Sequence, residues 1–536
     1  MTLLLALACA GPDDEVPVEP AGPEPLAPVA ALSRISLDLR GRRPTEDEIL
    51  QVEADPAALA PLTETFLVDA GFGERLVTWY ADVYRTRTDA FVVGADGNAE
   101  FLDDASRLAF LRSVGEEPLR IIQRIADDDL PYTTLVTADW TMTDDSLLRS
   151  LPLEAIEDGE GWRKARYTDS RPAAGVLAAN GLWWRYTTTI ENVNRGRAEA
   201  VARYILCDDR YDQPVEFRTS TDVLDSAELH DRVQTDEACI SCHTALDPLG
   251  SFFFGFYRNH PESFSEALLY YPGRENLWEE MTGVAPAFYG TPGNTLYDLG
   301  QLIAGDPRFP NCAVEQGFTF LMGRAPTIAD TDRVTAAREA FLTEGLTLRA
   351  LYRELVADPR YLSIDETVSG VVSLKRMGPD LLASSVQALT GFRWTYRGLD
   401  MLTTDAYGVR VLDGGADGAI VTQPATDHAT TTVLTQERLA EAAAAYAVAN
   451  EATLAVADRT LFREVEPGAA ATEDQLATQI RALILRAHGR RVEADDADVV
   501  SLAALWQEVE AEGGDPSRAW AVVLTALLRH PAFLQY

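Results

Sequence analysis

Two cysteines and a histidine lie close together in the segment Cys239-Ile240-Ser241-Cys242-His243. Cysteine side chains at this spacing can each form a thioether bond to a vinyl group of the same porphyrin, and the imidazole that follows can coordinate the iron. Such a pattern arises rarely by chance in a chain with five cysteines and six histidines. We therefore predict one covalently bound haem c, attached through Cys239 and Cys242, with His243 as an axial ligand of the iron.

Two other chemistries use a pair of cysteines at this spacing. A redox-active Cys-x-x-Cys pair belongs in a βαβ context, which the sequence around residue 239 does not predict. A structural zinc site needs further ligands, such as a second Cys-x-x-Cys pair, and the chain has none. Haem is the favoured interpretation, and the redox pair and the zinc site remain as alternatives.

The second axial ligand of the iron does not follow from the sequence. Met281, Met322 and His260 all lie downstream of the motif at distances that a fold can close. A thioether ligand would raise the reduction potential, whereas a second imidazole would lower it. We favour Met281, with an open or otherwise occupied position as the alternative.

Residues around the motif fit a haem environment. The turn Asp247-Pro248-Leu249-Gly250 leads into the aromatic segment Phe252–Tyr257, which we expect to line part of a haem cavity and exclude water from the iron. Arg185, Arg195 and Arg197 are candidates to balance the haem propionates, although arginines at the surface or at helix ends are equally common.

The N-terminus carries a short apolar run that ends at Cys9. This resembles the end of a bacterial lipoprotein signal, in which the cysteine becomes the lipidated first residue of the mature chain. No Lys or Arg precedes the run and the run is short, which a start codon assigned too late would explain. An ordinary secretory signal or a chance apolar terminus is the alternative. Residues 11–30 are rich in Pro, Glu and Ala, as in an extended spacer.

These features predict an exported protein in the cell envelope, either in the periplasm or as a lipoprotein of the outer membrane or surface. Apart from a lipid anchor at Cys9 we expect no membrane contact, since no segment has the 18 or more apolar residues of a membrane-spanning helix. With Cys9, Cys239 and Cys242 assigned, Cys207 and Cys312 remain. In an oxidising compartment we expect them to form a disulfide, with two buried thiols as the alternative.

Composition excludes some classes of partner. The formal net charge of −38 comes from 84 acidic and 46 basic residues, and would repel nucleic acids and anionic membrane surfaces. A chain of 536 residues is too long for one core, so we expect several packed units.

Apolar residues recur at helical spacing in many segments, and no segment has the alternation of a strand. We therefore predict a mainly α fold, with several helical units around a cytochrome-c-like haem segment and minor β structure. The clearest helical segments are residues 198–206, 331–342, 346–357, 439–448 and 518–528. The predicted divisions are a signal and tether (1–30), an N-terminal helical domain (31–170), a haem domain (171–290), a helical domain (291–365) and a C-terminal helical domain (366–536) with a long loop at 405–436.

A weak internal repeat is centred on Gly41, Gly323 and Gly489. Each copy predicts a helix that ends at the glycine in a left-handed turn before a new helix begins. Capping boxes are expected at Thr45 with Glu48 and at Thr327 with Asp330.

Several motifs together resemble a known family. They are Arg171-Pro-Ala-Ala-Gly-Val-Leu177, Asn194-Arg-Gly-Arg197, Tyr204-Ile-Leu-Cys207, the Cys-Ile-Ser-Cys-His motif with Asp-Pro-Leu-Gly, Phe309-Pro-Asn-Cys312 leading to Leu-Met-Gly-Arg324, and residues 34–50. The chain is similar here, over residues 34–365, to the planctomycete-type cytochrome-c-like proteins, large exported bacterial proteins with several domains of unknown function. The resemblance implies haem, export and a largely helical fold. Met322 stands where that family commonly has Leu, which counts against it as an iron ligand.

The favoured function is electron transfer within the cell envelope, to or from an exported redox partner that the sequence does not identify. The alternative is a structural or binding lipoprotein with a non-catalytic haem. A haem oxidoreductase acting on a small substrate is less favoured, because it would need an open iron position and a distal acid or base, and only six histidines are present. Whether the protein is an enzyme therefore stays open.

Overall fold

The computed structural model describes residues 24–87, 91, 103–189, 192–208, 235, 237–256, 269–363 and 374–536. Helices form most of this part of the chain and its strands are short, which confirms the predicted mainly α fold with minor β structure. Cys9, Tyr257 and His260 lie outside the described residues. No described helix has the length and apolar character needed to cross a membrane.

A first hydrophobic core gathers residues from position 32 to position 361, together with Leu485 from the C-terminal part of the chain. The units predicted at 31–170, 171–290 and 291–365 therefore pack around one shared core, and the boundaries between them stay predictions. Its main helices are α1 (Pro28–Arg40), α2 (Glu46–Ala54), α3 (Leu59–Leu67), α4 (Ala70–Tyr84), α5 (Asp104–Asp127), α6 (Thr134–Thr137), α8 (Asn180–Arg185), α9 (Arg195–Ala200), α11 (Glu237–Gly250), α14 (Leu296–Ala304), α15 (Arg308–Met322), α16 (Thr331–Thr343) and α17 (Leu348–Val356).

Shorter elements complete this part of the molecule. They are the helices α7 (Asp145–Ser150) and α13 (Trp278–Met281), the π-helical turn η3 (Val201–Ile205), and the 3-10 turns η1 (Pro56–Ala58), η2 (Gly175–Ala178), η5 (Ser251–Phe256), η6 (Pro272–Leu277) and η7 (Ile328–Asp330). The predicted helical segments at 198–206, 331–342 and 346–357 correspond to α9 with η3, α16 and α17, which confirms them.

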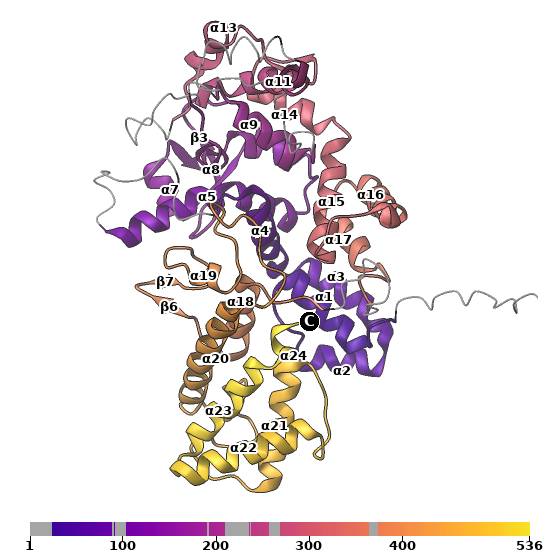
Figure 1. Cartoon of the computed structure of the whole chain (residues 1–536), viewed down its shortest axis with the longest axis vertical. Helices are drawn as coiled ribbons and strands as arrows, with labels where there is room; N and C mark the ends of the chain where they lie inside the picture. Colours follow the sequence, from indigo (N-terminus) through magenta and orange to yellow (C-terminus); the bar gives the residue numbers. More distant parts are fainter. Residues whose placement is uncertain are drawn as a thin grey trace, which may run out of the picture.

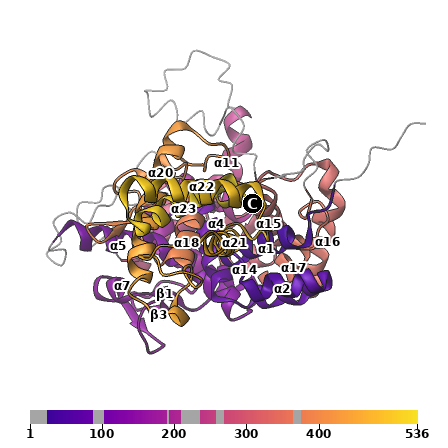
Figure 2. The same ribbon diagram turned by 90° about the horizontal axis from the view of Figure 1, so that it is seen from below.

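A second core belongs to residues 377–533 and fills the other end of the elongated molecule (Figure 1). Its helices are α18 (Pro379–Thr390), α19 (Val409–Leu412), α20 (Thr430–Glu451), α21 (Glu473–His488), α22 (Ala497–Gly513), α23 (Pro516–Arg529) and α24 (Pro531–Leu534), with the 3-10 turn η8 (Val456–Asp458). Seen along the long axis, α20, α23 and α22 lie side by side (Figure 2). Helices α20 and α23 contain the predicted segments 439–448 and 518–528.

The described strands form three small antiparallel sheets. Strands β1 (Thr141–Thr143) and β2 (Leu153–Ala155) both pair with β3 (Arg163–Tyr167), so the order is β1-β3-β2. Strands β4 (Ala287–Phe288) and β5 (Thr291–Pro292) form one hairpin, and β6 (Thr395–Tyr396) and β7 (Leu399–Asp400) form another.

The three predicted glycine turns are confirmed. Helices α1, α15 and α21 end at Gly41, Gly323 and Gly489, whose φ angles are +70°, +66° and +66°. Most side chains are strained in this left-handed conformation, so glycine is the residue favoured at such a helix end. Capping boxes are formed by Thr45 with Glu48 and by Thr327 with Asp330, as predicted.

The long loop predicted at residues 405–436 is shorter in the structure. Helix α19 interrupts it, and its last residues form the first turns of α20, which begins at Thr430. The segment is rich in Gly, Thr and Asp, which predicted a loop over its whole length. Burial of Thr432, Thr435 and Gln436 on the inner face of α20 outweighs that weak local preference.

The buried carboxylate of Asp38 joins α1 to three distant parts of the chain. Lys375 donates to its two oxygens at 2.8 and 2.7 Å, the Tyr361 hydroxyl donates at 2.8 Å and the Tyr536 hydroxyl at 2.7 Å. Burial lowers the pKa of Lys375 and raises the pKa values of Tyr361 and Tyr536, so both phenols keep the protons that they donate. Figure 1 accordingly shows the C-terminus in the middle of the molecule, beside α1.

We expect the substitution Asp38→Asn to lower the free energy of unfolding by roughly 3–5 kcal/mol, because it leaves the buried Lys375 ammonium without its counter-charge. Urea denaturation followed by circular dichroism measures this change. The exposed Asp158 makes no ion pair among the described residues, so Asp158→Asn is the matched control and should change stability little. Equal stability of the two variants would contradict the role assigned to Asp38.

Candidate functional site

Helix α11 carries both cysteines and the histidine of the predicted haem motif. Cys242 follows Cys239 by three positions, so their side chains leave the helix about 60° apart around its axis and share one face. Both side chains are partly exposed, and Cys242 packs against the edge of the first core. The expectation that the two cysteines lie on one helix is confirmed.

The imidazole of His243 is held by a carboxylate one turn further along α11. Its Nδ1 atom lies 3.0 Å from Oδ1 of Asp247, and Arg195 on α9 donates from Nε to the same oxygen at 2.6 Å. Burial raises the pKa of Asp247, but hydrogen bonds from His243 and Arg195 outweigh it and the net pKa lies below its usual value. Asp247 is therefore ionised and anchored between two helices.

This arrangement fits a haem-binding histidine. An ionised carboxylate can only accept, so the imidazole donates from Nδ1, and its Nε2 atom keeps a lone pair available for a metal. Metal-binding histidines in proteins are commonly oriented in this way by a carboxylate. The donor set of α11, two thiols on one face and one oriented imidazole, thus fits attachment of a haem c.

A buried arginine lies close to α11. Arg197, on α9, donates to the carbonyls of Tyr186 at 3.1 Å and Phe253 at 3.4 Å and to the side chain of Asn194 at 2.9 Å. Among the described residues no carboxylate lies within ion-pair distance, and burial lowers the pKa of Arg197 to about 9. A guanidinium that is only 5% exposed and lacks an ionic partner is costly, so an anionic group beside it would be stabilising.

The other two arginines considered from the sequence have partners within the protein. Arg195 forms an ion pair with Asp247, so it helps to hold the carboxylate that orients His243. Arg185 donates to the carbonyl of Gly418 at 2.6 Å, which links α8 to the C-terminal unit. Of the three, Arg197 is the one that lies between α9 and the segment after α11 without a carboxylate partner among the described residues.

The aromatic segment after α11 is packed into the first core. Phe253 and Phe256 lie 4.6 and 6.2 Å from Trp183 between ring centroids, and Phe256 contacts Tyr270 edge to face. A Cβ atom on Gly255 would lie 2.1 Å from the Tyr270 ring, so glycine is required for this packing. The segment forms a rigid apolar support at the end of α11, and its contact with haem stays a prediction.

The candidate second ligands are placed differently. Met322, near the end of α15, is 4% exposed and belongs to the first core. Met281 ends α13 and is only partly buried, and the loop after it is tied to α11, because the Ser251 hydroxyl donates to the carbonyls of Asp247 and Val284. Figure 1 shows α13 and α11 together at one end of the molecule.

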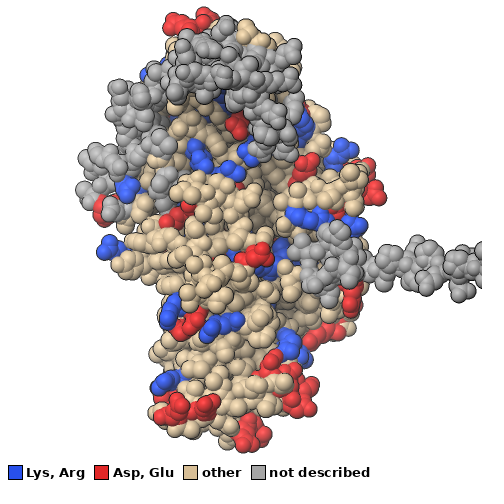
Figure 3. All heavy atoms as spheres, viewed as in Figure 1, with Lys and Arg blue, Asp and Glu red and all other residues tan. Residues whose placement is uncertain are grey.

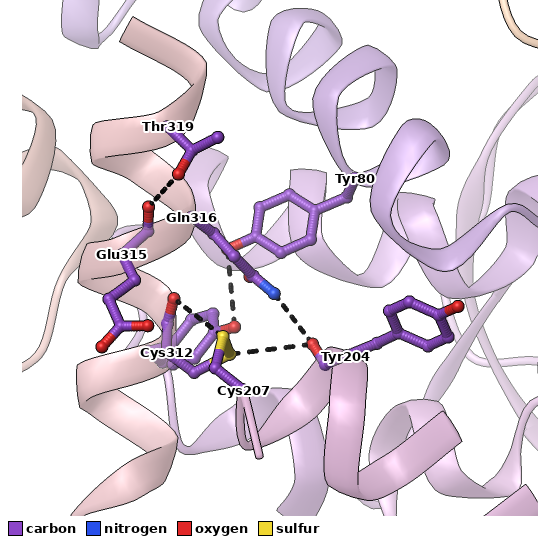
Figure 4. The surroundings of a disulfide bond; sticks show 8 residues. Tyr80, Tyr204, Cys207, Cys312, Glu315, Gln316 and Thr319 are labelled. Carbon is purple, nitrogen blue, oxygen red and sulfur yellow. Dashed lines mark hydrogen bonds between the residues drawn. A yellow bond between two sulfur atoms is a disulfide. The ribbon is translucent and has the colours of Figure 1, made fainter. Parts of the chain in front are cut away.

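Cys207 and Cys312 form a disulfide, with Cα atoms 5.2 Å apart, within the limit expected for such a pair. The bond joins the end of η3 to α15, and Figure 4 shows it beside the Tyr204 carbonyl, which accepts from Gln316 at 2.9 Å. The segment before the haem motif is therefore fastened to the core on which α11 packs.

The structure also bears on the two alternatives for the cysteine pair. All described strand pairs are antiparallel, so the described residues form no βαβ unit of the kind that accompanies a redox Cys-x-x-Cys motif. In the same part of the chain no group of three or more His, Cys, Asp and Glu side chains has an arrangement able to hold a metal ion.

Asp247 is a residue of the candidate site that the motif alone did not identify. It was seen only as the start of a turn, although α11 continues through Pro248 to Gly250. Its position four residues after His243 places both side chains on the same helix face, and that spacing could have revealed the pair.

Comparison with known proteins gives a partial match. Residues 289–360 match the model of a protein family of unknown function, DUF1585. This segment contains β5 and helices α14 to α17, including Cys312, and it begins after the haem motif. No curated protein and no solved structure matches the chain significantly.

We expect replacement of Cys207 and Cys312 by Ala to lower the free energy of unfolding by about 2–5 kcal/mol, because the bond closes a loop with a sequence separation of 105 residues. Urea denaturation under oxidising conditions measures the loss. A reductant should lower the free energy of unfolding of the parent protein by the same amount and should leave that of the double variant unchanged. If the reductant had no effect on the parent, the disulfide would not contribute to stability.

Proposed function

We propose that the protein is an exported c-type haem protein that transfers electrons within the cell envelope. One haem c would be attached through Cys239 and Cys242, with His243 as an axial iron ligand. The observation that carries this proposal is the hydrogen bond between His243 and Asp247, because it presents the imidazole to a metal through Nε2. A bound haem supplies a one-electron iron couple.

The surroundings of α11 support the same proposal. Arg197 offers a buried positive charge that lacks a carboxylate partner among the described residues, and a haem propionate would supply that partner. Asp247 and Arg195 would hold the imidazole in one orientation, and the packed aromatic segment would limit the access of water. The position of Met281 at the end of α13 keeps it as the favoured second ligand.

Electron transfer is favoured over catalysis by the placement of the histidines. Of the described histidines, His428, His488 and His530 all lie in the C-terminal unit, and His488 stacks on His530. Haem catalysis needs an acid or base on the distal side of the iron. Among the described histidines only His243 lies near the candidate site, and it is already assigned as an iron ligand. A structural or binding lipoprotein with a non-catalytic haem remains the second candidate.

The proposal also extends to family and location. The DUF1585 match supports the resemblance to planctomycete-type cytochrome-c-like proteins, which are built from domains of unknown function. Export would supply the oxidising compartment that suits the disulfide. A lipid anchor at Cys9 would hold the protein at the envelope, and its redox partner would be another exported protein.

We expect the protein, produced with haem-maturation machinery, to keep a haem stain on a denaturing gel, because a covalent haem survives unfolding. The double variant Cys239→Ala and Cys242→Ala should lose the stain completely. As a matched control, the double variant at Cys207 and Cys312 removes as many cysteines and should keep it. Staining that persists without Cys239 and Cys242, or that is absent from the parent protein, would contradict the proposal.

The spectrum of the same protein separates the candidate functions. A six-coordinate low-spin spectrum favours electron transfer, whereas a high-spin spectrum with an open iron position favours catalysis. We expect the low-spin form for the parent protein and a high-spin form for a variant in which His243 is replaced by Ala.

We expect Asp247→Asn to raise the reduction potential, because a neutral amide stabilises the more positive ferric state less than a carboxylate does. A tenfold change in relative affinity for the two oxidation states corresponds to about 59 mV for one electron, and we expect a rise of this order. Potentiometric titration measures it. Asp306→Asn, which removes a carboxylate paired with Arg308, is the control and should leave the potential unchanged. An unchanged reduction potential in the Asp247 variant would contradict the proposal that Asp247 accepts a hydrogen bond from the iron-binding imidazole.

A further inference from the structure

A cavity of about 560 Å³ lies between α1, α4 and α5 on one side and α18 with the β6–β7 hairpin on the other. Its volume is in the range of sites for small organic ligands. Figure 1 shows α18 and this hairpin near the middle of the molecule, whereas α11 lies at one end, so the cavity is separate from the candidate haem site.

The wall of the cavity is unusually basic for a chain with a net charge of −38. On the face seen in Figure 3, acidic side chains gather at the lower end of the molecule, and basic and acidic side chains are mixed nearer the middle. Six arginines line the cavity, together with the four carboxylates of Glu74, Glu116, Asp380 and Asp400, and Glu48 pairs with Arg40 from outside the lining. The arginines are Arg40, Arg75, Arg87, Arg112, Arg120 and Arg393.

The central carboxylate is fully occupied by the protein. Glu116 accepts from Arg87 at 3.1 Å, Arg112 at 2.9 Å and Arg120 at 2.7 Å. Burial raises the pKa of Glu116, but these three guanidinium groups outweigh it and hold the pKa far below its usual value. Glu116 is therefore ionised and fixes the three arginines in place. Arg87 also pairs with Asp380 at 2.9 Å, and Arg120 also pairs with Glu74 at 2.6 Å.

Arg75, on α4, is the cavity arginine with the least compensation. It is 8% exposed, its Nε atom donates to the carbonyl of Asp38 at 3.1 Å and its guanidinium lies over the Trp79 ring. Among the described residues no carboxylate is within ion-pair distance, and its two Nη atoms have no hydrogen-bond acceptor. A nearly buried fork of donors without an acceptor, in the wall of a cavity, is suited to a carboxylate.

Polar groups without charge surround this fork. Thr78, Ser384, Thr403 and Thr404 contribute hydroxyls to the cavity wall, and Gln387 contributes an amide. Neither Thr403 nor Gln387 uses its side chain in a hydrogen bond to another described residue. Hydroxyl and amide groups recognise the hydroxyls of a ligand, and apolar lining is limited to a few side chains such as Leu108 and Leu399.

We infer that this cavity binds a small hydroxylated carboxylate of the sugar-acid class. Its carboxylate pairs with Arg75 at the buried side and supplies the counter-charge that Arg75 lacks among the described residues. Arg393, which also pairs with Asp400 at 3.5 Å, contributes near the rim. Its hydroxyls contact the threonines and the glutamine. The ligand thereby bridges the first core and the C-terminal unit, and this inference does not depend on the presence of haem.

The test is isothermal titration calorimetry of the full-length protein with glucuronate as the probe. We expect binding of glucuronate, with glucose and inorganic phosphate at least tenfold weaker, because glucose lacks the charge and phosphate lacks the hydroxyl contacts. Arg75→Gln should weaken glucuronate binding at least tenfold. Arg438→Gln, which changes an exposed arginine on α20, is the matched control and should bind as the parent protein does.

A second variant keeps the test decisive if Arg75→Gln fails to fold. Arg393 is largely exposed, so Arg393→Gln should fold normally and bind glucuronate at least threefold more weakly. No heat of binding for glucuronate in the millimolar range would overturn the inference. So would glucose or phosphate binding as tightly as glucuronate, or unchanged affinity in the Arg393 variant.

Discussion

The buried Asp38 carboxylate is the interaction on which the arrangement of the molecule depends. It receives hydrogen bonds from the end of the first unit, from the chain that enters the second unit and from the last residue, so its position on α1 fixes all three. Burying a carboxylate is costly unless each lone pair finds a donor, and here the donors come from residues far apart in sequence. Helix α1 also gives Leu32 and Ile35 to the first core and Leu37 to the second.

In the candidate haem site, too, a carboxylate accepts hydrogen bonds from side chains of different elements and holds them together. Asp247 holds the His243 imidazole from within α11, and Arg195 fixes that carboxylate from α9. The two helices are in turn joined to the core by packing and, through the Cys207–Cys312 disulfide, to α15. The reduction potential of a haem bound by His243 would depend on the orientation of the imidazole. A carboxylate hydrogen-bonded by groups from two helices fixes that orientation.

Local rules were sufficient for much of the prediction. The helical spacing of apolar residues located α16, α17, α20 and α23. This spacing can be recognised within a few helical turns, so it does not depend on distant parts of the chain. The glycine turns and capping boxes were predictable for the same reason, since each depends on residues at most a few positions apart. The loop at 405–436 was overestimated, because burial of a threonine face of α20 depends on the helices packed against it and leaves no local signal.

The sequence by itself determined the residue types of the candidate site, the helical class of the fold and, by elimination, the cysteine pair Cys207 and Cys312. Only the tertiary structure decided that most of the buried apolar residues between 32 and 361 share one core, that Asp38 meets Tyr536, and that Arg75 lacks a carboxylate partner among the described residues. Such contacts join residues separated by tens to hundreds of positions. Their energies depend on burial and on complementary partners in space, and a one-dimensional pattern of residue types does not specify either.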